Sequence, residues 1–138
     1  MSNTLDTARA FFEACESGQG WEACAGYCRA DAVFSCQSGA LADVGTVQQY
    51  AEWMAGMKTP VPDAAFEIKS IAEDTAAGCV MVFAIFTGTH TGPGGPGEPT
   101  GKTVKTDYVF VIQMDDGAIS GVIKVWNDAY ALAQLGWA

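Results

Sequence analysis

Lys124 interrupts an otherwise apolar stretch, 122–126, that is typical of a β-strand. Successive side chains of a strand point to opposite faces, so Lys124 shares its face with Trp126. If that face lines a cavity, burial lowers the pKa of the amine. This suits a general base, a Schiff-base amine or a group that holds an enolate oxygen. The alternative is a lysine that extends to solvent from a sheet edge, or pairs with Asp107 or Asp128.

His90 and Asp128 are the other candidate acids or bases. His90 is the single histidine of the chain and lies where a long predicted strand meets a loop rich in glycine and proline. Histidine titrates near neutral pH and is the commonest general acid or base, but a hydrogen bond that fixes the loop explains His90 equally well. Asp128 follows Trp126 and Asn127, and its alternative role is the N-cap of a helix over 129–135.

Aromatic and methionine side chains supply a possible cavity wall. Many such residues are plain core in any protein. Two of them lie on a predicted helix that would cover the mouth of the cavity. The substrate-binding candidates are Trp53, Met57, Tyr108, Phe110 and Trp126.

Charge and cysteine content exclude several classes of function. Sixteen acidic against seven basic residues give a formal charge of −9, which disfavours nucleic acid and anionic membranes as partners. The five cysteines have irregular spacing and one histidine accompanies them, so we expect buried, reduced thiols and no metal site. The glycine-rich segment 92–101 precedes a strand rather than a helix, which argues against a phosphate-binding loop.

The elements that must position these residues follow from periodicity. Helical spacing predicts helices over 5–15 and 21–28, and from 45 to the prolines at 60 and 62. Strands are predicted over 31–36, 65–71, 78–89, 102–114 and 118–126, with a hairpin turn at 115–117 and a closing helix over 128–135.

Helices come first and hairpin-linked strands follow, without βαβ alternation. This order predicts an α+β fold with an antiparallel sheet, in one domain over 1–138. A long, bent sheet needs cover on its concave face, which the N-terminal helices can provide. The space between a curved sheet and its helices is a natural pocket. The outer face also needs cover, so we expect a homodimer through the sheet face, built from alternate residues of strands 78–89 and 102–114.

The order of elements and several short motifs resemble the SnoaL-like polyketide cyclases of the nuclear transport factor 2-like superfamily. The matching segments are 88–93, 99–102, 116–117 and 134–136, together with 20–21 and 29–34. The resemblance covers nearly the whole chain. It implies a cone-shaped α+β barrel with an internal ligand cavity, usually a homodimer, that needs no metal or organic cofactor.

The resemblance also implies an acid/base position on the final strand, where the family's cyclases use an aspartate for an intramolecular aldol closure. Counting from the turn at Gly117 places that position at Lys124, and counting from Trp126 places it at Asn127, next to Asp128. The partner histidine of the family falls on Phe110. His90 lies within a matching motif.

Two functional hypotheses remain. The first is a cyclase, isomerase or related lyase that performs cofactor-free acid/base chemistry on a small apolar carbonyl compound, with Lys124, His90 and Asp128 as the catalytic candidates. The second is a noncatalytic small-molecule-binding or dimerisation module of the same fold. The first residues lack the basic start and apolar stretch of a secretory signal, so we expect a cytoplasmic protein.

Overall fold

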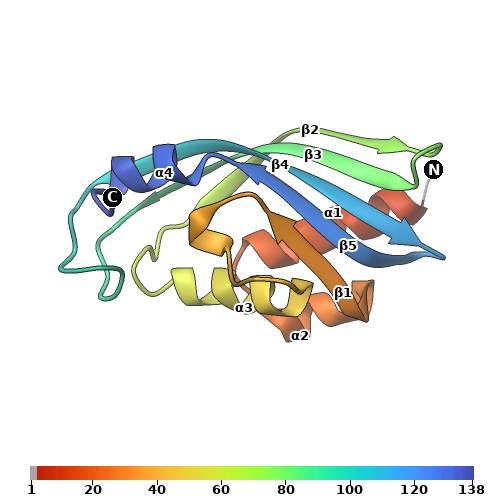
Figure 1. The fold of residues 1–138 in the computed structure, drawn as a ribbon, viewed down its shortest axis with the longest axis horizontal. Helices are drawn as coiled ribbons and strands as arrows, with labels where there is room; N and C mark the ends of the chain where they lie inside the picture. Colours follow the sequence, from red (N-terminus) through yellow and green to blue (C-terminus); the bar gives the residue numbers. More distant parts are fainter. Residues whose placement is uncertain (1–2) are drawn as a thin grey trace.

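A five-stranded curved sheet carries α1, α2 and α3 against one of its faces (Figure 1). The computed structural model describes residues 3–138. The elements in chain order are α1 (Asn3–Glu16), α2 (Trp21–Cys24), the short 3₁₀ helix η1 (Ala25–Tyr27), β1 (Cys28–Cys36), a second 3₁₀ helix η2 (Gly39–Leu41), α3 (Val47–Met57), β2 (Ala65–Asp74), β3 (Cys79–Thr89), β4 (Thr103–Asp115), β5 (Ala118–Trp126) and α4 (Asp128–Leu135).

The sheet confirms the predicted α+β class but is mixed rather than antiparallel throughout. Its strand order is β1-β5-β4-β3-β2. The pairs β2–β3, β3–β4 and β4–β5 are antiparallel, whereas β1 runs parallel to β5. Parallel partners need a long connection, and here it contains α3 and three strands. Local periodicity predicts each strand but carries no information on this pairing.

The β4–β5 connection is the tight turn that the sequence predicts. Asp116 has φ of 52° and Gly117 has φ of 81°. Two successive positive φ angles match the twist of a two-residue hairpin, and aspartate and glycine are the residues that tolerate them. The turn sets the register of its neighbouring pairs, and an irregularity between Gln113 and Met114 then shifts the register by one residue, so that Phe110 pairs with Lys124.

The helices are amphipathic, and their apolar faces pack on the sheet. In α1 the buried positions include Ala8, Phe11, Phe12 and Cys15, at helical spacing. The helix α3 begins with a capping box, in which the hydroxyl of Thr46 accepts from the Gln49 amide at 3.1 Å while the Gln49 side chain accepts from the Thr46 amide at 3.1 Å.

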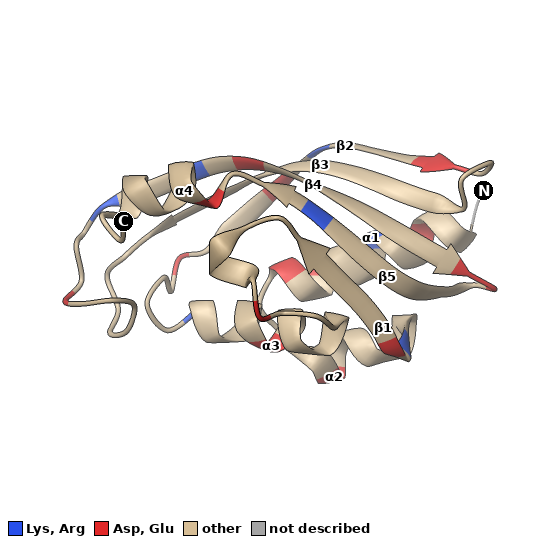
Figure 2. Cartoon of the chain, viewed as in Figure 1, with Lys and Arg blue, Asp and Glu red and all other residues tan. Residues whose placement is uncertain are grey.

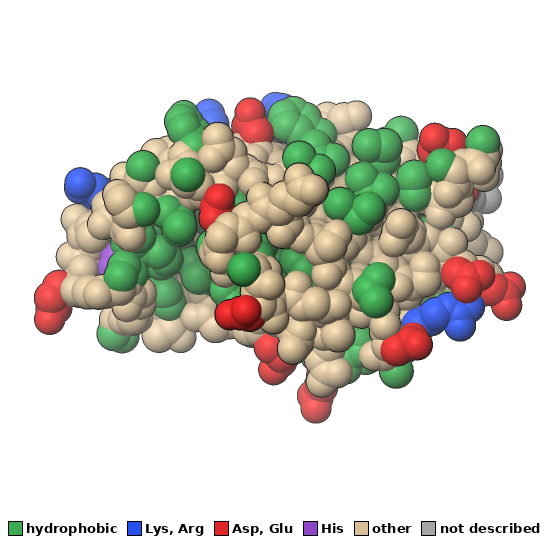
Figure 3. All heavy atoms as spheres, in the orientation of Figure 1, with side chains coloured by type: hydrophobic (Ala, Val, Ile, Leu, Met, Phe, Trp, Pro, Cys, Tyr) green, Lys and Arg blue, Asp and Glu red, His purple; other side chains and the backbone are tan. Residues whose placement is uncertain are grey.

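Side chains alternate along the central strands, so the sheet has an inner and an outer face. On β5, Lys124 is 6% exposed on the inner face and Val125 is 59% exposed on the outer face. Figure 3 shows hydrophobic side chains gathered over the outer face of the strands, while acidic positions are spread over helices, loops and strand ends (Figure 2). No helix within residues 3–138 has the length and apolar composition needed to cross a bilayer.

Candidate active site

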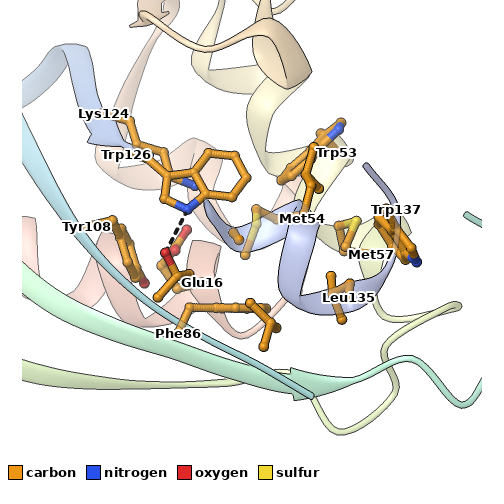
Figure 4. Close-up of a pocket in the computed structure, with 14 residues that line it drawn as sticks. Glu16, Trp53, Met54, Met57, Phe86, Tyr108, Lys124, Trp126, Leu135 and Trp137 are labelled. Carbon is orange, nitrogen blue, oxygen red and sulfur yellow. Dashed lines mark hydrogen bonds between the residues drawn. The ribbon is translucent and has the colours of Figure 1, made fainter. Parts of the chain in front are cut away.

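A narrow, mostly apolar pocket lies where the inner faces of β4 and β5 meet α3 and α4 (Figure 4). Its cavity volume is about 50 Å³, enough for a few water molecules. Two charged groups, Glu16 and Lys124, lie among its lining residues. The rest of the wall is Trp53, Met54, Met57, Phe86, Val104, Thr106, Tyr108, Trp126, Ala131, Leu132, Leu135 and Trp137.

Lys124, Tyr50 and Glu16 form one buried hydrogen-bonded chain. Lys124 Nζ donates to Tyr50 Oη at 3.0 Å, and the Tyr50 hydroxyl donates to Glu16 Oε2 at 2.9 Å. All three residues are buried. They come from β5, α3 and α1 respectively, so the packing of helices on the sheet brings together groups that are far apart in sequence.

Aromatic rings surround the amine of Lys124. Its Nζ atom lies 4.3 Å from the centroid of the Trp126 ring and 5.0 Å from that of Tyr50. The centroids of Tyr108 and Trp53 are 5.1 Å and 5.8 Å away. Ring faces attract a cation at these distances. The site can therefore hold a positive charge on this nitrogen without a carboxylate in direct contact.

Burial favours the neutral forms of both Lys124 and Glu16, the two end groups of the hydrogen-bonded chain. Desolvation lowers the pKa of Lys124, and the Glu16 carboxylate partly opposes that shift. Desolvation raises the pKa of Glu16, and Lys124 together with hydrogen bonds partly opposes it. The charged pair and the neutral pair are therefore closer in free energy than they are in water. A proton can pass from Lys124 to Glu16 through the Tyr50 hydroxyl, since that group both accepts and donates.

Tyr108 places a buried hydroxyl in the same pocket, close to the Glu16 carboxylate. Its Oη atom is buried and has no hydrogen-bond partner within residues 3–138. Burial, together with the Glu16 charge, raises the pKa of Tyr108, so the phenol keeps its proton. A buried donor without a partner is costly, and an oxygen atom of a bound ligand could supply that partner.

The structure places four of the five predicted substrate-binding residues in the pocket wall. Trp53, Met57, Tyr108 and Trp126 all line it. Phe110 does not. It is fully buried, and its ring packs against those of Phe12 and Tyr50, with centroids 5.0 Å and 5.8 Å away. The helix α1 covers this part of the sheet and fills the space in front of Phe110, which corrects its assignment as a ligand contact.

His90 lies outside the pocket and is fully buried. Its Nε2 atom donates to the Gly94 carbonyl at 3.0 Å, because a carbonyl oxygen only accepts. Its Nδ1 atom accepts from the Trp137 indole at 2.9 Å and the Thr100 amide at 3.3 Å. These hydrogen bonds fit the alternative role, in which His90 fixes the β3–β4 loop and here ties it to Trp137, a pocket-lining side chain.

Asp128 also points away from the pocket. Its Oδ2 atom accepts from the Ala40 amide at 2.9 Å, and this bond lowers the pKa of the carboxyl. The N-cap of α4 is Asn127, whose side chain accepts from the Tyr130 amide at 3.1 Å. The predicted N-cap role of Asp128 is therefore wrong, and its carboxylate lies outside this pocket. Lys124 is the one member of the three final-strand alternatives that lines the pocket.

Sequence reasoning missed Glu16 and the role of Tyr50. A usable signal existed for Glu16, since it lies four residues after Phe12 and therefore continues the apolar face of α1. Tyr50 continues the apolar face of α3, and nothing local indicates that its hydroxyl meets two charged groups. Within residues 3–138, no group of three or more His, Cys, Asp or Glu side chains is arranged so that it could hold a metal ion.

The curved sheet with helices on its inner face and a pocket between them defines the nuclear transport factor 2-like fold. The sequence profile of the SnoaL-like polyketide cyclases matches residues 6–135, and this chain belongs to that family. No curated protein matches it.

Solved structures share the fold at low sequence identity. A SnoaL-like polyketide cyclase described from Jannaschia sp. CCS1 has a TM-score of 0.78 at 15% identity, over 99% of this chain and 93% of its own. IdmH, a proposed polyketide cyclase of Streptomyces antibioticus, has a TM-score of 0.75 at 24% identity, over 96% and 98%. AclR of Streptomyces galilaeus, described as a proposed hydroxylase, has a TM-score of 0.76 at 21% identity, over 98% and 85%. These neighbours differ in described activity, so the site must indicate the chemistry.

Proposed function

We propose that this protein is an enzyme of the cyclase or isomerase type that performs cofactor-free acid/base chemistry on a small apolar carbonyl compound. The observation that carries the proposal is the buried amine of Lys124 at the pocket, linked through Tyr50 to Glu16. A lysine in an apolar environment with a proton acceptor two hydrogen bonds away can act as a base near neutral pH.

The residues have the following roles in this proposal. Glu16 accepts the ammonium proton of Lys124 through Tyr50, which frees the amine. The amine removes a proton from the carbon next to the substrate carbonyl, and the Tyr108 hydroxyl donates to the developing enolate oxygen. The Lys124 ammonium then returns the proton to carbon or oxygen. The wall formed by Trp53, Met57 and Trp126 favours an apolar substrate.

Hydrogen exchange at the α-carbon tests the proposal without knowledge of the natural substrate. Small ketones such as cyclohexanone are incubated with the protein in D₂O, and NMR follows deuterium incorporation. We expect incorporation above the buffer rate, and a loss of roughly 100-fold or more in Lys124→Met. Methionine keeps the length and apolar stem of the side chain. Lys105→Met, on the same sheet but exposed, is the matched control.

A result without exchange would contradict the enzyme proposal. If the same ketones nevertheless raise the melting temperature, the alternative function of a noncatalytic small-molecule-binding module is supported. That alternative draws on the same pocket, whose lining offers few polar groups.

We further propose that the protein forms a homodimer through the outer sheet face. Met81 and Phe83 of β3 and Ile123 and Val125 of β5 are exposed there, and β4 lies between them in register. A second copy offers an equally apolar face, whereas the acidic remainder of the surface would repel it.

A further inference from the structure

We propose that the Lys124 amine forms a covalent imine with the carbonyl carbon of an aldehyde or ketone bound in the pocket. This inference rests on the proposed function, since it uses the same pocket and the same class of substrate. It gives the Lys124 amine the role of nucleophile, so the Glu16 carboxylate, which is ionised again after condensation, takes over the removal of the α-proton. It follows from the geometry around Nζ, from the proton path to Glu16 and from the unpartnered hydroxyl of Tyr108.

The amine of Lys124 is not held in an ion pair. The ion pairs within residues 3–138 join Arg29 to Asp115 and Lys69 to Glu67, both at the surface. Lys124 donates instead to a neutral phenol, Tyr50 Oη. A carboxylate in direct contact would hold the proton on the nitrogen, whereas the phenol is a weaker acceptor that can pass a proton onward. The amine can therefore become free while it remains in place.

The aromatic surroundings suit the product of condensation as well as the starting ammonium. Four rings lie with centroids 4.3–5.8 Å from Nζ. A protonated imine carries its positive charge on the same nitrogen. The rings therefore stabilise the cation before and after the reaction, and no new charge has to be buried.

The step balances with the groups present. The Lys124 ammonium gives one proton to Glu16 through Tyr50, and the free amine adds to the carbonyl carbon to form a C–N bond. A proton moves from nitrogen to the former carbonyl oxygen, giving a carbinolamine. Glu16 returns its proton to that hydroxyl, the C–O bond breaks and water leaves. The product is a protonated imine on Lys124 with Glu16 ionised, as at the start.

Tyr108 and the apolar wall favour the same course. The free Tyr108 hydroxyl can donate to the carbonyl oxygen and polarise it toward attack. The narrow space and apolar walls limit water, which would hydrolyse the imine. A protonated imine withdraws electrons from the neighbouring carbon more strongly than a carbonyl, so it promotes the proton removal that a cyclase or isomerase needs.

Reductive trapping tests the inference. The protein is incubated at about pH 7 with sodium cyanoborohydride and either benzaldehyde, which has no α-hydrogen, or cyclohexanone, and peptide mass spectrometry locates the adduct. We expect modification of Lys124 at least about 10-fold faster than of Lys58, Lys69, Lys102 or Lys105, because burial lowers the pKa of Lys124 and so raises its share of free amine. Lys124→Arg should lack the adduct, Lys105→Arg should keep it, and Glu16→Gln should form it more slowly.

If all lysines were modified at the same rate, or if Lys124 were not modified, the inference would be overturned. The mapping in the unmodified sequence does not depend on whether a Lys124 variant folds. Deuterium exchange without a Lys124 adduct would leave the proposed acid/base function standing and remove the imine. Absence of both would remove both, and an adduct without exchange would support imine formation and contradict acid/base turnover.

Discussion

Lys124 and Glu16 lie at the two ends of a single hydrogen-bonded chain, with the Tyr50 hydroxyl as the link between them. Neither charged group contacts solvent to any extent, since both are buried. A lysine and a glutamate bridged by a phenol allow a proton to move from one to the other without a change in net charge. This property distinguishes the site from a buried salt bridge, and the first two predictions depend on it.

The pH dependence of activity should reveal the coupling of Glu16 to Lys124. The rate of α-hydrogen exchange is expected to rise with pH, with a midpoint below the ordinary pKa of lysine, because burial lowers the pKa of Lys124. Glu16→Gln removes the negative charge that raises this pKa, so the midpoint should move to lower pH while the maximum rate falls roughly 10-fold or more. Glu13→Gln, exposed on the same helix, should change neither. A midpoint that stays fixed or moves upward in Glu16→Gln would contradict the coupling.

Tyr50→Phe should break the hydrogen-bonded connection between Lys124 and Glu16. The substitution removes one hydroxyl and leaves two buried polar groups without their shared partner, which costs about 1–3 kcal/mol in the free energy of unfolding. In a double-mutant cycle with Glu16→Gln, the losses in exchange rate should be far from additive, since either change interrupts the same path. Urea unfolding and NMR exchange measure the two effects. Tyr130→Phe, at an exposed tyrosine, is the control, and additive rate losses would argue against a shared path.

His90→Ala should weaken the protein more than it impairs the chemistry. The Trp137 indole, the Thr100 amide and the Gly94 carbonyl all lose their bond to the imidazole. Buried groups left without partners predict a loss of about 2–3 kcal/mol in unfolding free energy. The maximum rate per folded molecule should change less than in Lys124→Met, although substrate affinity falls because Trp137 lines the pocket. A loss of rate equal to that of Lys124→Met, in folded protein, would restore a catalytic role for His90.

Val125→Lys should dissociate the proposed homodimer. Val125 is 59% exposed at the centre of the outer face, in register with Val109. A lysine there brings charge into an apolar interface, and it also reduces the net negative charge, so overall repulsion cannot explain dissociation. Sedimentation velocity should show a dimer for the unmodified chain and for Glu13→Lys, which lies on α1 across the sheet, and a monomer for Val125→Lys. A monomeric unmodified chain at micromolar concentration would refute the interface.

The sequence predicts what depends on local patterns. Alternation in the stretch 122–126 correctly places Lys124 on the same face as Trp126, although it does not say that this face is the inner one. The predicted bounds of β5 and α4 match the structure. The hairpin turn at Asp116 and Gly117 is also correct. Each of these follows from neighbouring residues, because strand geometry and turn conformation are set over a few positions.

The remainder of the site depends on tertiary packing. Glu16 meets Tyr50 because α1 and α3 lie against the same part of the sheet, and no local pattern specifies that contact. His90 is at the predicted strand end, yet the partner that determines its role, Trp137, comes from the far end of the chain. Such pairings depend on the angle at which the helices cross the sheet. The hydrophobic periodicity of a single helix or strand does not predict that angle.

The parallel pairing of β1 with β5 has a consequence for the order of assembly during synthesis. β1 is translated early, but its only sheet neighbour is the last strand to be made. The edge strand β1 therefore cannot complete its pairing in the sheet until β5 has been synthesised, and a chain that stops before residue 124 lacks the amine of the proposed site. Contacts of such long range slow folding. Here they also mean that the proposed site stays incomplete until β5, which carries Lys124, is in place.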